Sequence, residues 1–248
     1  MIILKSDREI GYMREAGRVV AETHREVAKA VASGVTTEEL NQVAENYLVH
    51  RGAIASFKGY GGFPASICAS VNDEVVHGIP GLRKLKNGDI ISIDIGAIVN
   101  GFQGDAAVTL PVGEIDAEAQ HLLEVTEQSL MRGIKQAVVG NRLSDISHEV
   151  QTFVESQGFS VVRDYVGHGI GRNMHEPPQV PNYGIPGRGP RLKEGLTLAI
   201  EPMVNMGTHE VEVQLDNWTV LTKDRKLSAH FEHTIAITQK GPEILTKL

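Results

Sequence analysis

The spacing of apolar residues predicts a long helix at the start of the chain. Apolar positions recur at helical intervals from Ile10 to Val31. Ser6 and Glu9 precede this pattern with the spacing of a capping box, which is typical of a helix N-terminus. We therefore expect one long helix that begins after Ser6 and ends near Gly34.

Three further helices follow from the same kind of pattern. Thr36 has a glutamate three residues later and should cap a second helix that ends before Gly52. Apolar periodicity also predicts helices over residues 116–139 and 144–157. Strand-like runs fill the region of about 53–110 and the segment from residue 158 to the C-terminus.

Two segments of the chain resemble each other. Residues 34–52 and 140–158 have the same length, begin and end on glycine, and align their apolar positions. Each follows a long helix and precedes strand-like runs. We therefore expect a duplicated unit of two helices and a sheet, with halves of about 1–110 and 111–248 and a pseudo-twofold α+β architecture.

The segment SIDIGAIVNGFQGDAAVTL predicts a β-hairpin that contains two acids. Asn100-Gly101 is the preferred sequence of a two-residue hairpin turn, and it places Asp94 and Asp105 on one face as diagonal neighbours. Gly96 would face Asp105 and leave open space beside the two acids. Carboxylates in an apolar strand are costly unless they share a proton or bind a cation.

The second half of the chain supplies further candidates for such a site. His168 and His175 lie in YVGHGIGRNMHEPP, while Glu201 and Glu232 end or interrupt apolar runs. Any one of them alone would be typical of a solvated strand end or of a histidine that hydrogen-bonds the backbone. Together, the acids and one histidine favour an oxygen-rich site for two divalent ions with a water or hydroxide between them.

Composition and charge limit the function classes. The chain has 248 residues, of which 41% are hydrophobic, as expected of a folded protein with a substantial core. Its net charge of −7 comes from interspersed acids and bases without a basic cluster, which argues against nucleic acid as a partner. No signal-peptide or membrane-spanning pattern is present, and Cys68 is the only cysteine. We expect a cytoplasmic protein that does not bind membranes.

The motif order resembles that of the type I methionine aminopeptidases. The resemblance rests on DIGAIVNGFQGD, GHGIGRNMHEPPQVPNYG, IEPMV and LSAHFEHTIAIT, and it extends over nearly the whole chain. It implies the pita-bread fold, in which duplicated units of two helices and a sheet surround a curved antiparallel sheet, as a single catalytic domain over residues 1–248. It also implies removal of the N-terminal, initiator methionine from nascent proteins and peptides.

The resemblance implies two divalent metal ions and their ligands. One ion would be bound by Asp94, Asp105 and Glu232. The other would be bound by Asp105, His168, Glu201 and Glu232, and a hydroxide that bridges both ions would be the nucleophile. Cobalt, manganese, iron or zinc would suit such a ligand set, and the sequence does not select the physiological metal.

His77 and His175 resemble the substrate histidines of that family. We expect His175 to hydrogen-bond the scissile carbonyl oxygen, His77 to contact the scissile nitrogen, and Glu201 to shuttle a proton.

An apolar pocket for a methionine side chain is implied as well. Beside the two histidines, its expected walls are Tyr60, Phe63, Cys68, Met174, Met203 and Trp218. Gly96, Met174 and His230 depart from the residues that are common at these positions in the family, which are threonine, an aromatic residue and glutamine. These departures leave the details of the pocket and the tuning of the metals open.

Two alternatives remain at this stage. An X-Pro-type peptidase of the same fold is one, although such relatives usually carry an additional N-terminal domain. A pita-bread protein that binds without catalysis is the other, although every expected ligand and both histidines are present. For the enzyme we expect nascent polypeptide N-termini as partners, association with the ribosome, and a monomeric state.

Overall fold

The computed structural model describes residues 1–248 and contains all the helices that the sequence predicts. They are α1 (Asp7–Ala30), α2 (Thr37–His50), α3 (Ala117–Gln136) and α4 (Leu143–Ser156), together with a short 3-10 helix, η1 (Tyr60–Gly62). α3 ends earlier than the predicted Val139. The Asn141 side chain donates a hydrogen bond of 2.9 Å to the Gln136 carbonyl oxygen, so this group is satisfied without a further helical turn.

Both predicted capping boxes are present. The Ser6 backbone N–H donates to Glu9 Oε2 over 3.0 Å, and the Ser6 hydroxyl accepts from the Glu9 backbone N–H. Thr36 and Glu39 form the same reciprocal pair at the start of α2, with a distance of 2.7 Å from the Thr36 N–H to Glu39 Oε2. The local sequence therefore sets where each of these helices begins.

The strands form four antiparallel sheets. Their orders are β1-β4-β2 with β5 beside β4, β13-β10-β6, β11-β12-β3, and β15-β14-β9-β7-β8. The bounds are β1 (Ile54–Ala55), β2 (Ile67–Val71), β3 (Glu74–Val76), β4 (Ile90–Val99), β5 (Phe102–Pro111), β6 (Ser160–Val161), β7 (Gly167–Gly169), β8 (Glu176–Val180), β9 (Thr197–Ile200), β10 (Met203–Asn205), β11 (Val211–Val213), β12 (Val220–Thr222), β13 (Ser228–His230), β14 (His233–Thr238) and β15 (Gly241–Ile244). The predicted α+β class and antiparallel sheets are confirmed.

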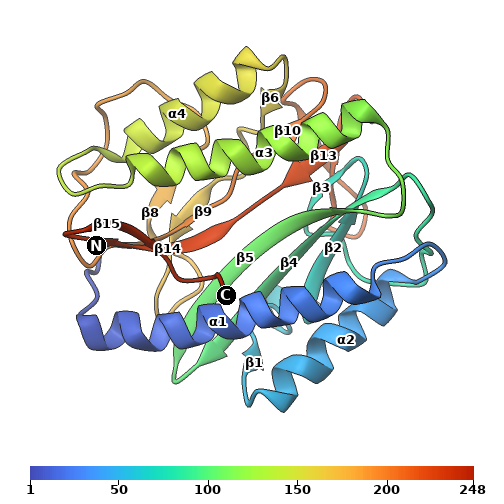
Figure 1. Ribbon diagram of the computed structural model, residues 1–248, viewed down its shortest axis with the longest axis horizontal. Helices are drawn as coiled ribbons and strands as arrows, with labels where there is room; N and C mark the ends of the chain where they lie inside the picture. Colours follow the sequence, from blue (N-terminus) through green and yellow to red (C-terminus); the bar gives the residue numbers. More distant parts are fainter.

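The helices lie in pairs on opposite sides of the strands (Figure 1). α1 and α2 pack their apolar faces on β2, β4 and β5, and this contact forms the largest buried apolar cluster. α3 and α4 cover strands of the second half of the chain and form two further clusters. In this view the strands lie between the two helix pairs. The polar residues that the sequence singles out must therefore find their partners among the strands. None of the helices combines the length and the apolar character that crossing a membrane requires.

The β4–β5 hairpin has the predicted register. Asp94 pairs with Ala107 and Gly96 pairs with Asp105, with no irregularity along the two strands. Asn100 and Gly101 have positive φ values of 52° and 76°, as a two-residue turn of this kind requires. The hairpin therefore holds both aspartates on one face, as the sequence indicates.

β5 meets the second half of the chain beside Asp105. The Thr234 hydroxyl accepts from the Asp105 N–H over 3.0 Å and donates to the Asp105 carbonyl oxygen over 2.8 Å. The Glu232 N–H donates to the Ala107 carbonyl oxygen over 2.9 Å. These bonds bring Asp105 and Glu232 together although they are far apart in the sequence.

Candidate active site

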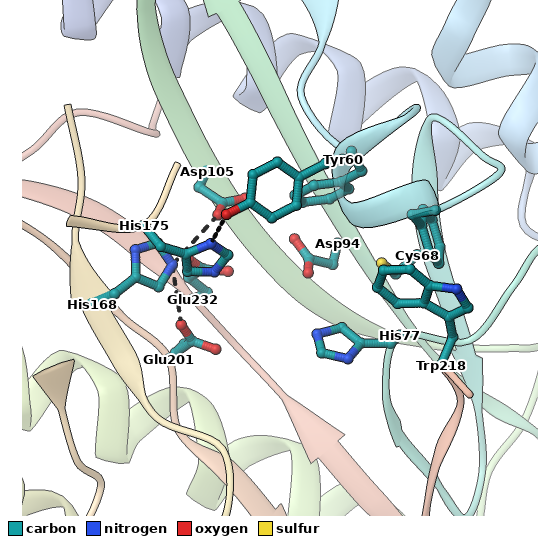
Figure 2. Close-up of a pocket in the computed structure, with 12 residues that line it drawn as sticks. Tyr60, Cys68, His77, Asp94, Asp105, His168, His175, Glu201, Trp218 and Glu232 are labelled. Carbon is teal, nitrogen blue, oxygen red and sulfur yellow. Dashed lines mark hydrogen bonds and ion pairs between the residues drawn. The ribbon is translucent and has the colours of Figure 1, made fainter. Parts of the chain in front are cut away.

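One cavity gathers most of the residues that the sequence singles out (Figure 2). It has a volume of about 160 Å³ and lies among β2, β4, β5 and the strands of the second half. Its lining residues are Phe57, Tyr60, Phe63, Cys68, His77, Asp94, Asp105, His168, His175, Glu201, Trp218 and Glu232. The expected metal ligands, both expected substrate histidines and four of the expected pocket walls therefore surround one space.

Met174 and Met203 are not among the residues that line this cavity, and their expected role as pocket walls stays a prediction. Met203 packs in an apolar cluster with Val75, Val76, Val162 and Val220. Met174 is also buried, in the cluster that joins α1 to the end of the chain. Both side chains therefore pack against apolar residues of the core.

The expected open space beside Gly96 is also absent. A Cβ atom on Gly96 would lie 2.7 Å from Ser56 Cβ, 2.9 Å from Met174 Cε and 3.0 Å from Phe57 Cε1. The missing side chain of Gly96 therefore makes room for Met174 and Phe57, and two of the noted departures belong to one packing arrangement.

The candidate metal ligands lie within reach of one another. Asp105, His168 and Glu232 each offer a ligand atom within 4.8 Å of the others. His168 Nε2 lies 3.9 Å from Asp105 Oδ2 and 3.5 Å from Glu201 Oε1. The His168 Nδ1–H donates to the Gly169 carbonyl oxygen over 2.9 Å, which leaves Nε2 without a hydrogen and able to bind a metal.

The acids at this site repel one another and are cut off from water. Burial raises the pKa of Asp105 to about 7. Burial and the neighbouring carboxylates raise the pKa values of Asp94, Glu201 and Glu232 well above their usual range. Buried carboxylates in such a group would otherwise have to be protonated, so a cation is the partner that would keep them ionised.

Three carboxylate oxygens of this acidic group indicate that a metal ion fits among them. Asp94 Oδ1, Asp105 Oδ1 and Glu232 Oε1 are buried and have no hydrogen-bond partner. An orphaned buried carboxylate oxygen is costly, and a divalent cation compensates it directly. The donor set of carboxylates and one imidazole is the kind that first-row divalent ions accept, so these residues fit the metal centre that their types suggest.

His230 lies next to this group although the sequence analysis did not include it among the ligands. Its Nε2 atom lies 3.7 Å from Glu201 Oε2 and is itself buried without a hydrogen-bond partner. Glu201, His230 and Glu232 form a second set of ligand atoms within 4.8 Å of one another. His230 precedes Glu232 by two residues, and in an extended segment this spacing places both side chains on one face. The spacing could therefore have identified His230 as a candidate ligand.

The two expected substrate histidines are neutral near pH 7. Burial lowers the pKa of His77 to about 4, and burial also lowers the pKa of His175. His77 has a positive φ of 61°, a conformation that costs energy for any residue other than glycine and often occurs at functional sites. The Nδ1 atom of His175 lies 2.7 Å from the Tyr60 hydroxyl.

The side of the cavity away from the carboxylates is apolar. Phe63 and Trp218 meet edge to face with ring centroids 5.1 Å apart, and Cys68 packs in the same cluster. Cys68 pairs with Asp94 across β2 and β4, so the apolar wall begins directly beside the acids. Phe57 lines this cavity too and was missed. The only sequence signal for it is its place in the aromatic loop SFKGYGGF.

Comparisons with known proteins find relatives that match this chain over nearly its whole length. The sequence matches metallopeptidase family M24 over residues 11–239. It is 60% identical to methionine aminopeptidase 1 of Bacillus subtilis over 248 residues, which cover 100% of both proteins. The crystal structure of methionine aminopeptidase from Thermotoga maritima superposes with a TM-score of 0.98 at 50% identity, again over 100% of both chains.

A more distant likeness concerns the fold alone. The prolidase of Pyrococcus horikoshii superposes with a TM-score of 0.80 at 20% identity. The superposition covers 100% of this chain but only 64% of the prolidase chain. The shared architecture is the pita-bread fold that the motifs imply, and its prediction is confirmed.

Proposed function

This chain belongs to metallopeptidase family M24 and, within it, to the methionine aminopeptidases, and on that premise we propose that it removes the N-terminal methionine from nascent proteins and peptides. The observation that carries the proposal is the division of the cavity (Figure 2). Buried acids and His168 occupy one side, and Phe63, Cys68 and Trp218 form the apolar other side. A substrate with a free amine and an apolar first side chain suits both sides at once.

We propose that two divalent ions bind on the acidic side. Asp94, Asp105 and Glu232 would hold one ion, and Asp105, His168, Glu201 and Glu232 would hold the other. When bound, such ions supply Lewis-acid chemistry, since they activate a water molecule near neutral pH and stabilise negative charge on the reacting oxygens. The identity of the physiological metal stays open among cobalt, manganese, iron and zinc.

The residues around the ions would orient the substrate and handle its charges. His175 would donate a hydrogen bond to the scissile carbonyl oxygen, whose charge grows as the tetrahedral intermediate forms. His77 would contact the scissile nitrogen, and Glu201 would carry a proton toward the leaving amine. Both histidines suit donation in the neutral form, because burial lowers their pKa values and leaves one N–H on each ring.

The apolar wall would select methionine. Phe63, Cys68 and Trp218 present apolar surfaces, so an unbranched thioether side chain gains dispersion contacts there. A lysine or aspartate side chain would lose its hydration against these surfaces, and the acids beside Cys68 would already be neutralised by the ions. The substrate amine would lie near the carboxylates, which restricts cleavage to the first residue of a chain.

Peptide hydrolysis by metal-stripped protein tests the proposal. Cobalt, manganese, iron or zinc is added back in turn, with Met-Ala, Lys-Ala and X-Pro peptides measured side by side. We expect metal-dependent release of methionine, with little release of lysine and little cleavage of X-Pro peptides. Preferred X-Pro cleavage would favour the prolidase-type alternative, and binding of Met-Ala peptides without hydrolysis under any metal would favour a non-catalytic binding protein.

Three expectations from the sequence stay predictions. They are the cytoplasmic location, association with the ribosome, and the monomeric state.

A further inference from the structure

Tyr60 lines the cavity and also contacts the ring of His175. Its hydroxyl oxygen lies 2.7 Å from His175 Nδ1, as the dashed line in Figure 2 shows. An imidazole has only two nitrogens. With Nδ1 bound to Tyr60, only Nε2 of His175 can reach a substrate in the cavity.

The chemistry of the two groups sets the direction of this hydrogen bond. A phenol is a far stronger acid than the N–H of a neutral imidazole, and the bare imidazole nitrogen is the better base. The Tyr60 O–H therefore donates to Nδ1. An imidazole ring carries a hydrogen on at least one nitrogen, and Nδ1 of His175 accepts the hydrogen of Tyr60 and has none of its own, so a ring hydrogen must be on Nε2.

We propose that Tyr60 is a positioning residue that holds His175 in the tautomer with its hydrogen on Nε2, ready to donate to the scissile carbonyl oxygen. This inference rests on the proposed function, because it requires that His175 acts as an oxyanion donor. The opposite tautomer would present a lone pair to the developing negative charge and would repel it.

The loop that carries Tyr60 is built to hold it in place. Its N–H donates to the Phe57 carbonyl oxygen over 2.9 Å, and its own carbonyl oxygen accepts from the Phe63 N–H over 2.9 Å. Positive φ values occur at each of its flanking glycines, which are Gly59, Gly61 and Gly62. Because glycine adopts such angles at little cost, the sequence KGYGGF favours this turn and the place of the hydroxyl above His175.

The same loop packs against the apolar wall of the cavity. A Cβ atom on Gly61 would lie 3.2 Å from Trp218 Cη2, so the absence of a side chain lets the backbone approach the indole closely. The Tyr60 side chain itself is 47% exposed. Its hydroxyl can therefore be removed without leaving a buried cavity.

The variant Tyr60→Phe isolates the hydroxyl because it keeps the ring. We expect kcat for Met-Ala peptides to fall by about 10-fold or more, which is the scale of losing a group that orients a catalytic residue. KM should change by less than about twofold, because the hydroxyl acts on the transition state through His175. The melting temperature should stay at the parent value. Tyr183→Phe is the matched control, since Tyr183 is 37% exposed, lies outside the cavity lining, and should keep its kcat.

A double-mutant cycle with His175→Ala shows whether the hydroxyl acts through His175. In the His175→Ala background, Tyr60→Phe should cause no further loss of kcat, because no ring remains to be oriented. An unchanged kcat in Tyr60→Phe, or a rise in KM alone, would overturn the inference. An equal loss of kcat in both backgrounds would also overturn it, since the hydroxyl would then act on the substrate directly. Failure of the parent protein to release methionine would instead contradict the proposed function.

Discussion

Lys5 Nζ lies 2.6 Å from Glu176 Oε2, and each of these side chains is only 4% exposed. The ion pair joins the segment before α1 to the residue that directly follows His175. Glu176 Oε1 also accepts a hydrogen bond of 3.2 Å from the Asn173 N–H, so the carboxylate closes the short turn that carries His175. A glycine is required beside it, since a Cβ atom on Gly171 would lie 2.5 Å from Lys5 Cε.

Breaking this pair from one side should destabilise the protein strongly. Lys5→Met keeps most of the side-chain volume but leaves the Glu176 carboxylate buried without its cation. We expect the free energy of unfolding in urea to fall by about 3–5 kcal/mol. The double variant Lys5→Met/Glu176→Gln removes both charges and keeps an acceptor for Asn173, so it should recover much of this loss. Equal destabilisation of the single and double variants would show that packing, not the unpaired charge, is the cause.

Replacing an acid that both ions would share should abolish metal binding without destabilising the fold. Asp105→Asn replaces a proposed ligand of both ions by a neutral group of the same shape. We expect loss of peptide hydrolysis and loss of paired metal occupancy, measured by metal analysis of the purified protein. The melting temperature of the metal-free variant should not fall, because a buried acid with a raised pKa has been removed from a group of like charges. Binding of two ions with continued turnover would contradict the ligand assignment.

His175→Ala should affect chemistry more than substrate binding. The carbonyl oxygen gains its charge only on the way to the tetrahedral intermediate, so the hydrogen bond from His175 is strongest in the transition state. We expect kcat to fall by about 10²–10³-fold with little change in KM, as for the loss of one oxyanion donor. Metal content should stay the same. If His175 only stabilised its loop, the variant would instead melt at lower temperature and show a large rise in KM with kcat nearly kept.

The hairpin with Asp94 and Asp105 illustrates what local sequence can predict. Asn100-Gly101 determines the turn, the turn determines the register, and the register places both acids on one face. The assembly of the site with His168, Glu201 and Glu232 was suggested by their positions in apolar runs and by family resemblance. No local rule brings these distant segments together, since that depends on contacts such as the one between Thr234 and Asp105.

The features that the sequence did not reveal depend on packing between distant side chains. Methionine is a residue type that suits an apolar pocket wall, but residue type alone does not distinguish a pocket from the core in which Met203 lies. Gly96 indicated open space, and only the positions of Phe57 and Met174 show that it is filled. The hydrogen bond from Tyr60 to His175 and the ion pair of Lys5 with Glu176 likewise join segments that have no sequence pattern in common.

His24 on α1 should make stability depend on pH, because its ring is buried behind β5. Its Nε2–H donates to the Ala106 carbonyl oxygen over 2.8 Å, while its buried Nδ1 has no partner. Burial, and to a lesser extent His233, lowers the pKa of His24 from 6.5 to about 4. Between these values the unfolded chain binds a proton at this residue that the folded protein does not, so the contribution of His24 to stability must fall as the pH decreases from about 6.5 to about 4.

The variant His24→Gln can donate to Ala106 but cannot be protonated, so it isolates this contribution. Unfolding in urea of the metal-stripped proteins at pH 7.5 and pH 4.5 gives the loss of stability for each. We expect the parent protein to lose about 2–3 kcal/mol more than His24→Gln over this interval, since one pKa unit corresponds to about 1.4 kcal/mol. His50→Gln, at an exposed position of α2, is the control and should lose as much as the parent. Equal losses in the parent and in His24→Gln would show that the buried ring accepts its proton without cost, contrary to the orphaned Nδ1 atom and the closed packing around it.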